Sequence, residues 1–536
     1  MQPSRRSFLA GTFAAGAALS GVPLAPSASA QSAGPAFGAA PARVPLTREE
    51  HRVVVVGSGF GGGVSALRLT QAGVPVLMLE RGREWKSGPN QDTFPLATKP
   101  DKRLLWHGAT ERVAGQRVEV EPHVGLIDAF AGENMTALAP AGLGGWSLIY
   151  QGMSLQPAEH VFNEYLPEQL DWQMMNRDHY PRVARMLHLA VAPDELIESP
   201  TYLPSRVFAD NARRAGLSVS KIPMPIDWNY ALAELRGEMK PAYTNGDGAM
   251  GVNNGGKFSV GATYIEAARR TGLLQVETHH EVTDVDRAPD GRWVVWVNRT
   301  DDTGKTVEQK VITTPTLIMA AGSIHTTRLL VRARDRGDVS DLPDAIGQGW
   351  GTNADRIYGW HNPGVPFGVQ QGGPVVYGSL NWDSAESAHT VIQASTPPLG
   401  VDLRTTVMVG FGASRDRGNF FYDSSRDDAA LYWPPNGDSE IQWGHIHPTA
   451  TALAGPGGQL IDTNAVFNST WHSLGGACMG AACDLEGRVD GQHGLYVLDG
   501  VLIPGATAAC NPSMTIAAVA ERAMDSIVRN DVGTII

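Results

Sequence analysis

The chain has 536 residues, of which 42% are hydrophobic and 18% are charged, so it is long and apolar enough to bury a large core. At this length we expect roughly two to four domains, or two large interleaved ones. The formal net charge of −12 argues against non-specific binding to nucleic acid. Its 3 cysteines are too few for a disulfide framework, and they lack the spacing of a zinc or iron–sulfur site.

The N-terminal segment has the pattern of an export signal. Paired arginines in Ser4–Ala10 precede an apolar stretch rich in alanine and glycine, which ends in the small residues Ala28-Ser29-Ala30. This pattern predicts a twin-arginine signal peptide that is cleaved after Ala30, and hence a secreted or periplasmic protein. A tail with chance arginines is the alternative. No later apolar run in the sequence is long enough to span a bilayer.

A strand–helix–strand unit is predicted next. Val53–Val56 is a continuous apolar run, typical of a strand buried on both faces of a parallel sheet. A helical pattern then leads to Gly73, and a second apolar run, Val76–Leu79, ends at Glu80. Residues 31–50, which precede the unit, are small and polar, and they predict a flexible lead-in.

The glycines between this strand and helix indicate a dinucleotide site. Gly57, Gly59 and Gly62 form a G-x-G-x-x-G motif, in which glycine permits a tight turn, close approach to a pyrophosphate, and close helix packing. The helix N-terminus offers N–H groups to the phosphates, and Glu80 can accept hydrogen bonds from a ribose. A glycine-rich surface turn is the alternative, and the motif alone does not separate FAD from NAD.

The later chain predicts more sheet and a final helix. We expect strands at Leu274–Thr278, Glu281–Val285, Trp293–Val297 and Val311–Met319. Residues 355–450 are rich in β-branched, aromatic and turn residues and predict an antiparallel sheet. Apolar residues at helical spacing from Ile516 to Val528 predict a C-terminal helix.

Several later segments resemble motifs of the glucose–methanol–choline (GMC) oxidoreductases, and they occur in the family's order over roughly residues 50–530. Gly142–Met153 resembles the second glycine-rich flavin motif, and Trp471–Gly476 resembles the segment that carries the active-site histidine. The C-terminal signature is matched by Val497–Pro504, Cys510–Ile516 and Ala520–Arg522. The resemblance implies that the dinucleotide is FAD and that the enzyme oxidises an alcohol. An NAD dehydrogenase would leave these motifs unexplained.

The resemblance also implies an α/β fold, α+β overall. A Rossmann-like FAD-binding domain would be built from both chain ends, and a substrate domain would have a large, mostly antiparallel sheet with covering helices. After the signal peptide (1–30) and the lead-in (31–50), we expect FAD-binding segments at 51–175, 251–350 and 466–536, and substrate-domain segments at 176–250 and 351–465.

The residues expected to contact FAD combine the first glycine motif with positions carried over from the family. They are Gly57, Gly59, Phe60, Gly62, Glu80, Gly142, Gly144, Gly145, Ser147, Tyr150, Met153, Val282, Ala321, Gly322, Asp499, Gly500, Asn511, Pro512 and Ser513. For Asp499, an ordinary turn carboxylate is the alternative.

Within the family, the chain is most similar to the bacterial cholesterol oxidases with non-covalent FAD, as seen in Ala66–Gly73, Asn253–Lys257 and Gly347–Gly351. This likeness implies oxidation of a bulky apolar secondary alcohol, with 3β-hydroxysterols such as cholesterol leading. The hydride would pass to flavin N5, and O2 would be reduced to H2O2.

Two residues depart from that subfamily. Gln393 stands where the subfamily has a glutamate, and an amide cannot act as a base, so we expect little or no steroid isomerisation. Tyr150 replaces an asparagine that usually lies beside the flavin, which is expected to alter the reaction with oxygen.

The candidate catalytic residues are His472, Asn511 and Gln393. An imidazole can hold or transfer the hydroxyl proton near neutral pH, which suits His472. Locally, Asn511 and Pro512 read as the N-cap and first residue of the C-terminal helix, while the resemblance gives the amide a bond to the substrate oxygen. His445 and His447 are expected on one face of a strand without a metal, because no further ligand has suitable spacing.

Two alternatives stay open: a GMC dehydrogenase that passes electrons to a quinone or protein, and a flavoprotein with a lyase-like reaction. The expected partners are the alcohol and O2, with transient membrane-surface contact, no nucleic acid, and a monomeric state. Residues 80–130, with Trp85, Trp106 and His107, are expected to form a lid over the cofactor.

Overall fold

The computed structural model describes residues 44–107, 111–113, 116–118 and 121–536. The predicted export signal lies outside the described residues. Within them, no helix is long and apolar enough to cross a membrane.

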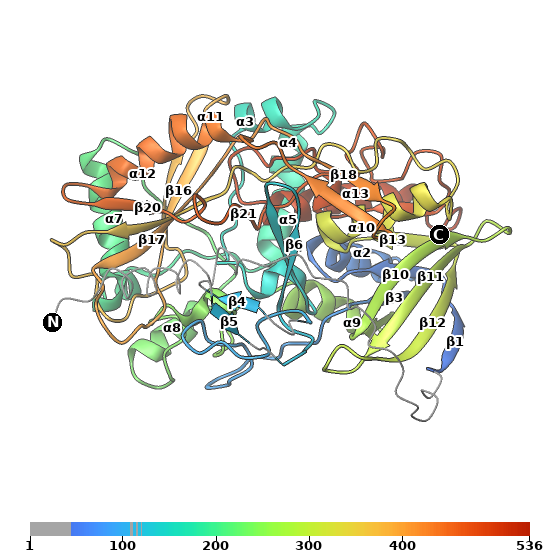
Figure 1. Ribbon diagram of the computed structural model, residues 1–536, viewed down its shortest axis with the longest axis horizontal. Helices are drawn as coiled ribbons and strands as arrows, with labels where there is room; N and C mark the ends of the chain where they lie inside the picture. Colours follow the sequence, from blue (N-terminus) through green and yellow to red (C-terminus); the bar gives the residue numbers. More distant parts are fainter. Residues whose placement is uncertain (1–43, 108–110, 114–115, 119–120) are drawn as a thin grey trace.

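A parallel five-stranded sheet forms the centre of one half of the molecule, on the right in Figure 1. Its strands lie in the order β22 (Leu495–Val497), β13 (Thr316–Met319), β2 (Val53–Val56), β3 (Val76–Leu79) and β9 (Leu274–Glu277). All residues of β2, β3 and β13 are buried, as expected for a parallel sheet covered on both faces. Because strands from both chain ends meet in this sheet, the predicted Rossmann-like organisation is confirmed.

Two helices pack together against this sheet. Helix α2 (Phe60–Gln71) links β2 to β3, and α13 (Ser513–Asn530) carries the predicted C-terminal apolar stripe. Arg68 of α2 bonds Glu521 of α13 at 2.6 Å. A Cβ atom on Gly61 would lie 1.4 Å from the Leu498 carbonyl oxygen, so only glycine allows α2 to approach this loop so closely.

A four-stranded sheet lies next to the parallel sheet and changes two predictions. Its order is β1 (Leu46–Glu50), β12 (Thr306–Thr314), β11 (Trp293–Thr300) and β10 (His280–Arg287). The lead-in predicted for 31–50 is therefore wrong for Leu46–Glu50, where a charged edge strand pairs with β12 and Glu49 bonds Lys310 at 2.9 Å. The single strand predicted over Val311–Met319 is two strands, because Pro315 separates β12 from β13 and has no N–H for a ladder.

The second half of the molecule, on the left in Figure 1, contains the predicted antiparallel sheet. Its order is β20 (Gln459–Asp462), β14 (Arg356–His361), β17 (Thr405–Gly412), β16 (His389–Ala394), β15 (Tyr377–Asn381) and β8 (Ser220–Lys221). The helices α7 (Leu203–Arg214) and α12 (His447–Ala454) pack on it. The prediction of sheet up to residue 450 is wrong for Ser439–Ala454, which is helical through α11 (Ser439–Ile441), η6 (Gln442–Ile446) and α12; the sheet resumes with β20.

The remaining elements connect these layers. Small sheets are formed by β21 (Ser469–Thr470) with β7 (Thr136–Pro140) and β6 (Ile127–Ala131), by β18 (Asn419–Asp423) with β19 (Asp428–Tyr432), and by β4 (Glu111–Val113) with β5 (Gln116–Val118). The other helices are α3 (Glu159–Tyr165), α4 (Trp172–Met174), η2 (Met175–His179), α5 (Tyr180–Met186), α6 (Asp194–Ile197), α8 (Trp228–Leu235), α9 (Glu266–Arg269), α10 (Gly322–Arg336) and the short turns η1 (Gly145–Leu148), η3 (Pro200–Tyr202), η4 (Asp247–Met250), η5 (Gly261–Ile265) and η7 (Gly500–Leu502).

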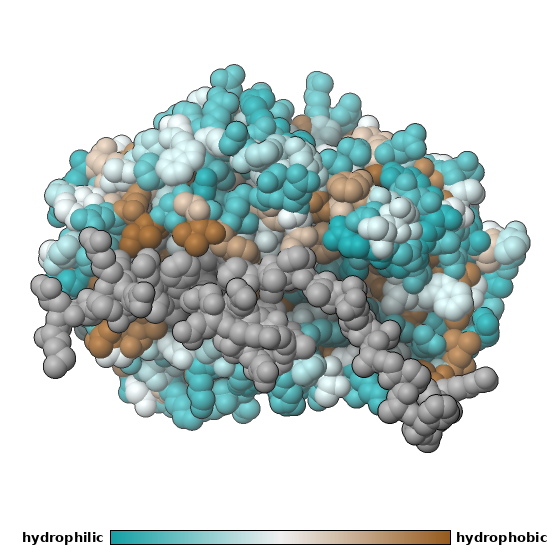
Figure 2. All heavy atoms as spheres, in the orientation of Figure 1, coloured by the Kyte–Doolittle hydropathy of each residue, from teal (hydrophilic) through white to brown (hydrophobic). Residues whose placement is uncertain are grey.

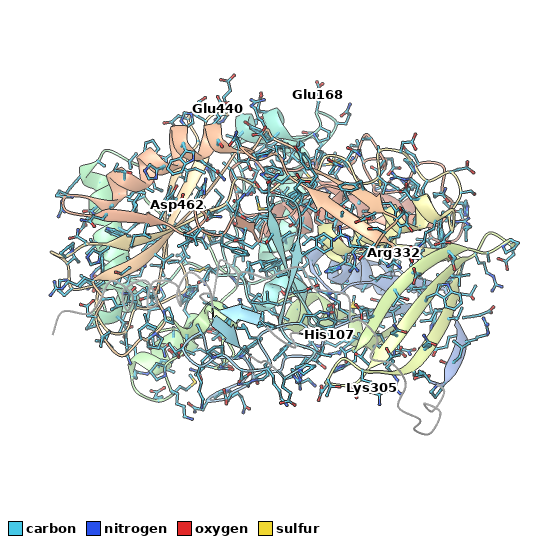
Figure 3. All side chains as sticks on the ribbon, in the orientation of Figure 1. His107, Glu168, Lys305, Arg332, Glu440 and Asp462 are labelled. Atoms are coloured by element: carbon cyan, nitrogen blue, oxygen red, sulfur yellow. The ribbon has the colours of Figure 1, made fainter. Side chains whose placement is uncertain are left out.

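The face of the molecule drawn in Figure 2 is mainly polar outside the grey atoms. Charged side chains such as Glu168 and Glu440 extend outward from the helical edge of the molecule (Figure 3). On the face drawn in Figure 2, hydrophobic residues form small patches among hydrophilic ones, outside the grey atoms.

Candidate active site

A cavity lies at the carboxyl ends of the parallel strands, where open α/β sheets bind their ligands. Residues that follow four strands line it: Gly57 and Gly59 after β2, Glu80 after β3, Ala321 and Gly322 after β13, and Asp499 and Gly500 after β22. Phe60, Gly145 and Val282, also predicted to contact FAD, complete this part of the wall. We call it the cofactor cavity.

The three glycines of the first motif differ in what a side chain would meet at each position. Gly57 has a φ of +99°, and a Cβ there would lie 2.2 Å from the Ala320 carbonyl oxygen. A Cβ on Gly62 would lie 2.2 Å from the Gly57 carbonyl oxygen, so Gly62 serves packing and does not line the cavity. A Cβ on Gly59 would meet nothing within 4 Å, which leaves open space for a ligand.

The N-terminus of α2 fits a pyrophosphate. Gly59 is its N-cap, no side chain caps the helix, and its first turn carries no acidic residue. Backbone N–H groups and the positive end of the helix dipole therefore face the cofactor cavity without a competing anion. On this observation the residues present fit the diphosphate of FAD.

Glu80 ends β3 inside the cofactor cavity, as predicted. Its Oε1 accepts hydrogen bonds from the N–H groups of Gly82 (2.8 Å) and Gly142 (3.2 Å), and its Oε2 accepts one from the Ser58 hydroxyl. Burial raises the pKa of the Glu80 carboxyl. Its contact with a ribose stays a prediction.

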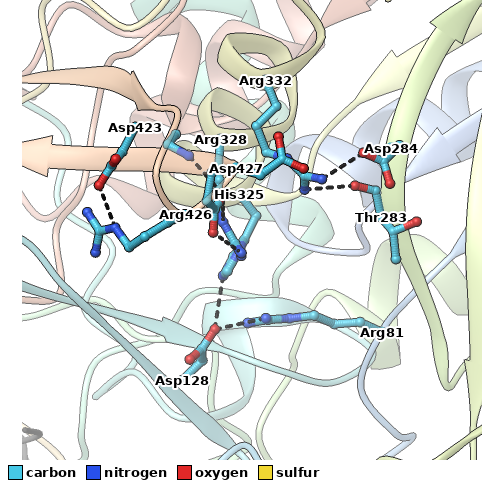
Figure 4. A network of polar contacts seen from close by, with 12 residues as sticks. Arg81, Asp128, Thr283, Asp284, His325, Arg328, Arg332, Asp423, Arg426 and Asp427 are labelled. Atoms are coloured by element: carbon cyan, nitrogen blue, oxygen red, sulfur yellow. Dashed lines mark hydrogen bonds and ion pairs between the residues drawn. The ribbon is translucent and has the colours of Figure 1, made fainter. Parts of the chain in front are cut away.

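A charged network that was not predicted contributes Arg81, His325 and Arg332 to the wall of the cofactor cavity (Figure 4). Asp128 bonds Arg81 at 2.9 Å and lies 3.2 Å from His325, and Arg332 bonds Asp284 at 2.7 Å. Arg332 lies beside β10 in Figure 3. Burial lowers the pKa of His325 to about 4, so its ring is neutral at neutral pH.

Asp499 is more than a turn carboxylate. It is 7% exposed, accepts hydrogen bonds from the N–H groups of Gly322 (2.6 Å) and Val501 (2.8 Å), and thereby joins the start of α10 to η7. Burial raises the pKa of Asp499 to about 6. Its carboxyl is therefore easier to protonate in the folded chain than in the unfolded chain.

This shift predicts a pH dependence of stability. The pKa of Asp499 in the folded chain is raised above its ordinary value of 3.8. The protonated carboxyl therefore contributes fully to the free energy of unfolding below about pH 4, and this contribution is lost as pH rises through about 6. We expect it to amount to about 3 kcal/mol in the free energy of unfolding of the FAD-free protein. Denaturant melts of wild type and Asp499→Asn from pH 4 to pH 7 check this. Asp438, whose pKa is also raised to about 6, titrates in both proteins and cancels in their difference. Parallel stability curves would contradict the prediction.

The second glycine motif separates into lining and supporting residues. Gly145 lines the cofactor cavity, whereas Tyr150 and Met153 line a second cavity described below. The three other predicted contacts stand behind the walls: Gly142 donates to Glu80, Gly144 donates to Ser58, and the Ser147 hydroxyl donates to the Gly144 carbonyl (2.6 Å). These three residues shape the site from behind.

A second, mostly apolar cavity adjoins the cofactor cavity. The two share five lining residues: Phe60, Leu138, Trp146, Ser473 and Ile516. Strands β16, β17 and β14 contribute aliphatic side chains to its wall, namely Ile392, Ala394, Val409 and Ile357. None of its described lining residues is Asp or Glu. We call it the alcohol cavity.

His472 lines the alcohol cavity and is held by a carboxylate that the sequence did not point out. Its Nδ1 lies 2.7 Å from Oδ1 of Asp355, which is 2% exposed. The Asp355 Oδ2 accepts hydrogen bonds from the Thr470 hydroxyl (2.8 Å) and from the His472 N–H (3.2 Å). A carboxylate only accepts, so this geometry favours the tautomer of the neutral ring that has its proton on Nδ1 and the lone pair on Nε2.

The loop that carries Asp355 is built with unusual backbone. Asn353 and Ala354 both have a φ of +58°, a conformation that costs energy for residues other than glycine. The Asn353 side chain donates to the Cys510 carbonyl (2.7 Å) and accepts from the Thr507 N–H (3.1 Å). The loop is thereby tied to the chain just before Asn511.

The role predicted for Asn511 needs correction. Both hydrogens of its Nδ2 are used, on the Met153 carbonyl (2.7 Å) and the Ser513 hydroxyl (2.7 Å), and Oδ1 accepts from the Leu155 N–H (3.1 Å). The amide therefore has no spare donor for a substrate oxygen. It does not cap α13 either, because the helix begins at Ser513 with Pro512 at its N-cap. Asn511 lines the alcohol cavity and fixes the flavin-motif segment.

The assignment of Gln393 to the catalytic centre is wrong. Side chains alternate along β16, so Ile392 and Ala394 face the alcohol cavity and Gln393 faces the opposite side. There it accepts a hydrogen bond from Ser205 of α7 (2.7 Å) and donates to Thr406 (3.1 Å). Gln393 is a buried structural residue.

The remaining predicted features are placed as follows. His445 and His447 lie on a helix, not a strand, because residues 439–454 pack as a helix on β16 and β17. Among the described residues, no group of three or more His, Cys, Asp or Glu could hold a metal, and the three cysteines are free and buried.

In residues 80–130, Trp85 bonds the Ala141 carbonyl and Trp106 stacks on Arg81 at 4.6 Å. Movement of this segment as a lid stays a prediction.

Comparisons with known proteins agree with this geometry. The N-terminal GMC oxidoreductase family profile matches residues 46–334, and the C-terminal one matches residues 435–520. The chain therefore belongs to the GMC oxidoreductases, a family of FAD-binding enzymes that oxidise alcohols.

Named relatives differ in the alcohols they oxidise. A cholesterol oxidase of Mycobacterium tuberculosis is 26% identical, with 89% of this chain and 91% of the relative covered. One of Acinetobacter baumannii is 24% identical, with 90% and 95% covered. Two solved structures share the fold at a TM-score of 0.60. Pyridoxine 4-oxidase from Mesorbium loti is 16% identical (89% and 99% covered), and a fungal aryl-alcohol oxidase is 14% identical (90% and 100% covered).

Proposed function

We propose that the protein is an exported oxidase that uses non-covalent FAD to oxidise a bulky apolar secondary alcohol, most specifically a 3β-hydroxysterol such as cholesterol. O2 accepts the electrons and becomes H2O2. The proposal includes a monomeric protein that makes brief contact with a membrane surface to take up its substrate and does not bind nucleic acid. The observation that carries the proposal is the Asp355–His472 pair at the wall of an apolar cavity that adjoins the cofactor cavity.

The mechanism follows from the protonation of this pair. The Nε2 lone pair of His472 accepts the hydroxyl proton of the alcohol, while the Nδ1 proton stays on its bond to Asp355. The negative charge of Asp355 stabilises the imidazolium that forms. FAD, held by the residues of the cofactor cavity, supplies the acceptor for the hydride that leaves the carbinol carbon. The apolar walls exclude water while the proton moves.

The shape and polarity of the alcohol cavity support an apolar substrate. Its described wall carries several aliphatic and aromatic side chains and no acid, so a charged or sugar-like alcohol would lose hydrogen bonds to water without replacement. The cholesterol oxidases among the relatives are consistent with a sterol. The two structural neighbours are named for other alcohols, which makes a non-sterol alcohol the second candidate.

Oxygen consumption tests the proposal. Purified enzyme with cholesterol in detergent is expected to consume O2 and release an equal amount of H2O2. Turnover of cholesterol only with an added quinone would indicate a dehydrogenase. Turnover of a benzylic or other alcohol but not cholesterol would overturn the sterol assignment.

We expect cholesterol to be oxidised with little shift of its double bond. Moving a proton between steroid carbons requires a base besides the one that takes the hydroxyl proton, and apart from His472 no Asp, Glu or His lines the described wall of the alcohol cavity. The unconjugated 3-ketone is therefore the main enzymatic product, which NMR of the extracted steroid identifies. Gln393→Glu leaves this outcome unchanged, because residue 393 faces Ser205 and not the cavity. Rapid formation of the conjugated ketone by wild type would contradict the prediction.

We expect FAD to be released intact when the protein is precipitated with acid. Attachment to flavin commonly uses histidine or cysteine, and no cysteine lines either described cavity. Of the histidines that line the two cavities, His472 is bonded to Asp355, His280 lies 3.0 Å from Glu277, and His325 lies 3.2 Å from Asp128. Chromatography of the supernatant checks this. Yellow colour that stays with the pellet would indicate a covalent bond.

A further inference from the structure

The amine of Lys257 lies directly behind the second glycine motif. Its Nζ donates hydrogen bonds to the carbonyl oxygens of Leu148 (3.1 Å) and Tyr150. An antiparallel β-bridge pairs the backbone of Lys257 with that of Ile226. The two carbonyls belong to the segment whose side chains Ile149, Tyr150 and Met153 line the alcohol cavity.

This amine has no acidic partner in the described chain. Burial lowers the pKa of Lys257 to about 7, and no neighbouring carboxylate offsets this effect. Lysines that lose water usually gain an ion pair in exchange. A desolvated amine without one responds strongly to a negative charge that arises nearby.

The Tyr150 ring connects the amine to the site. Nζ lies 4.8 Å from the ring centroid, in cation–π range, and the same ring contacts Phe60 edge-on at 5.8 Å. Phe60 lines both the cofactor cavity and the alcohol cavity. In its protonated form, Lys257 therefore carries a positive charge that the Tyr150 ring separates from Phe60 at the junction of the two cavities.

We propose that Lys257 is a positioning residue that holds Tyr150 in the wall of the alcohol cavity, against Phe60, and places a positive charge behind it, which makes the bound flavin easier to reduce. When flavin accepts a hydride it gains electron density, and a nearby cation in a region of low dielectric constant stabilises that charge. The inference rests on FAD being bound as the proposed function states. It concerns the flavin equilibrium and does not depend on which alcohol is the substrate.

A purely structural role is the competing explanation. Leu148 ends the short helical turn η1, and a lysine that caps the carbonyls of a helix end needs no further purpose. Three substitutions separate the explanations. Lys257→Gln keeps an N–H donor and removes the charge, Lys257→Met removes both, and Lys257→Arg keeps the charge.

The midpoint potential of the bound flavin is the measurement, by reduction against a reference dye without any alcohol. We expect Lys257→Gln and Lys257→Met to disfavour the reduced flavin about tenfold, which is about 30 mV for a two-electron couple, and Lys257→Arg to stay near wild type. Wild-type potentials in both Lys257→Gln and Lys257→Met would overturn the proposal, as would a shift in Lys257→Met alone.

Retention of flavin absorbance in each variant confirms that the cofactor site is intact. If Lys257→Met loses FAD, the comparison of Lys257→Gln with Lys257→Arg still decides the question. Failure of wild type to oxidise cholesterol would affect the proposed substrate and leave this result standing.

Discussion

Replacing His472 with alanine lowers kcat/KM for alcohol oxidation by about a thousandfold, within the range typical for loss of a positioned general base. The alanine cannot take the hydroxyl proton, and no acid in the described wall of the alcohol cavity can replace it. The rate of flavin reduction by substrate, measured by stopped flow without oxygen, checks the prediction.

Two controls accompany this variant. His472 does not line the cofactor cavity, so His472→Ala should keep its flavin absorbance. His445 lies on η6 and has no role in the proposed reaction. The flavin of the His445→Ala variant should therefore be reduced at the wild-type rate. A His472→Ala enzyme that reduces flavin as fast as wild type would remove the histidine from the mechanism.

Replacing Asp355 with asparagine lowers the rate of flavin reduction by about a hundredfold or more. An amide oxygen can still accept a hydrogen bond from the Nδ1–H group, but it carries no negative charge to stabilise an imidazolium. If the amide nitrogen turns toward the ring instead, it forces the proton onto Nε2 and blocks proton uptake. Rates measured for Asp355→Asn and Asp355→Glu check this. The glutamate keeps the charge and should retain more activity.

The fold of the Asp355→Asn variant needs a separate test, because the residue also accepts from Thr470 and from backbone N–H groups. Thermal unfolding and flavin content report on that structural role. A variant with a lower melting temperature but wild-type flavin reduction would show that Asp355 only supports the loop.

The dinucleotide half of the fold could be predicted because its signals are local. The apolar run Val53–Val56, the glycines from Gly57 to Gly62 and Glu80 are close in sequence, and each has a conformational or chemical reason to occur there. The strand Leu46–Glu50 was missed for the opposite reason. It is a charged edge strand, and what makes it a strand is its distant partner β12.

The errors in the catalytic centre arise from contacts between distant residues. Asp355 and His472 are 117 positions apart, so the sequence around either residue does not indicate that the two side chains form a pair. The one available signal was an acid placed directly before the strand β14. Gln393 was misplaced because an alignment error of one residue within a strand moves the matched side chain to the other face of the sheet. For Asn511, the position next to the alcohol cavity could be predicted, but the three hydrogen bonds that occupy its amide could not.

The most direct test of a sterol oxidase is to mix the purified enzyme with cholesterol without oxygen and follow the absorbance of oxidised flavin. We expect one equivalent of cholesterol to bleach the flavin and air to restore the colour. A flavin that stays oxidised with cholesterol, in an enzyme that another alcohol reduces, would contradict the sterol oxidase assignment.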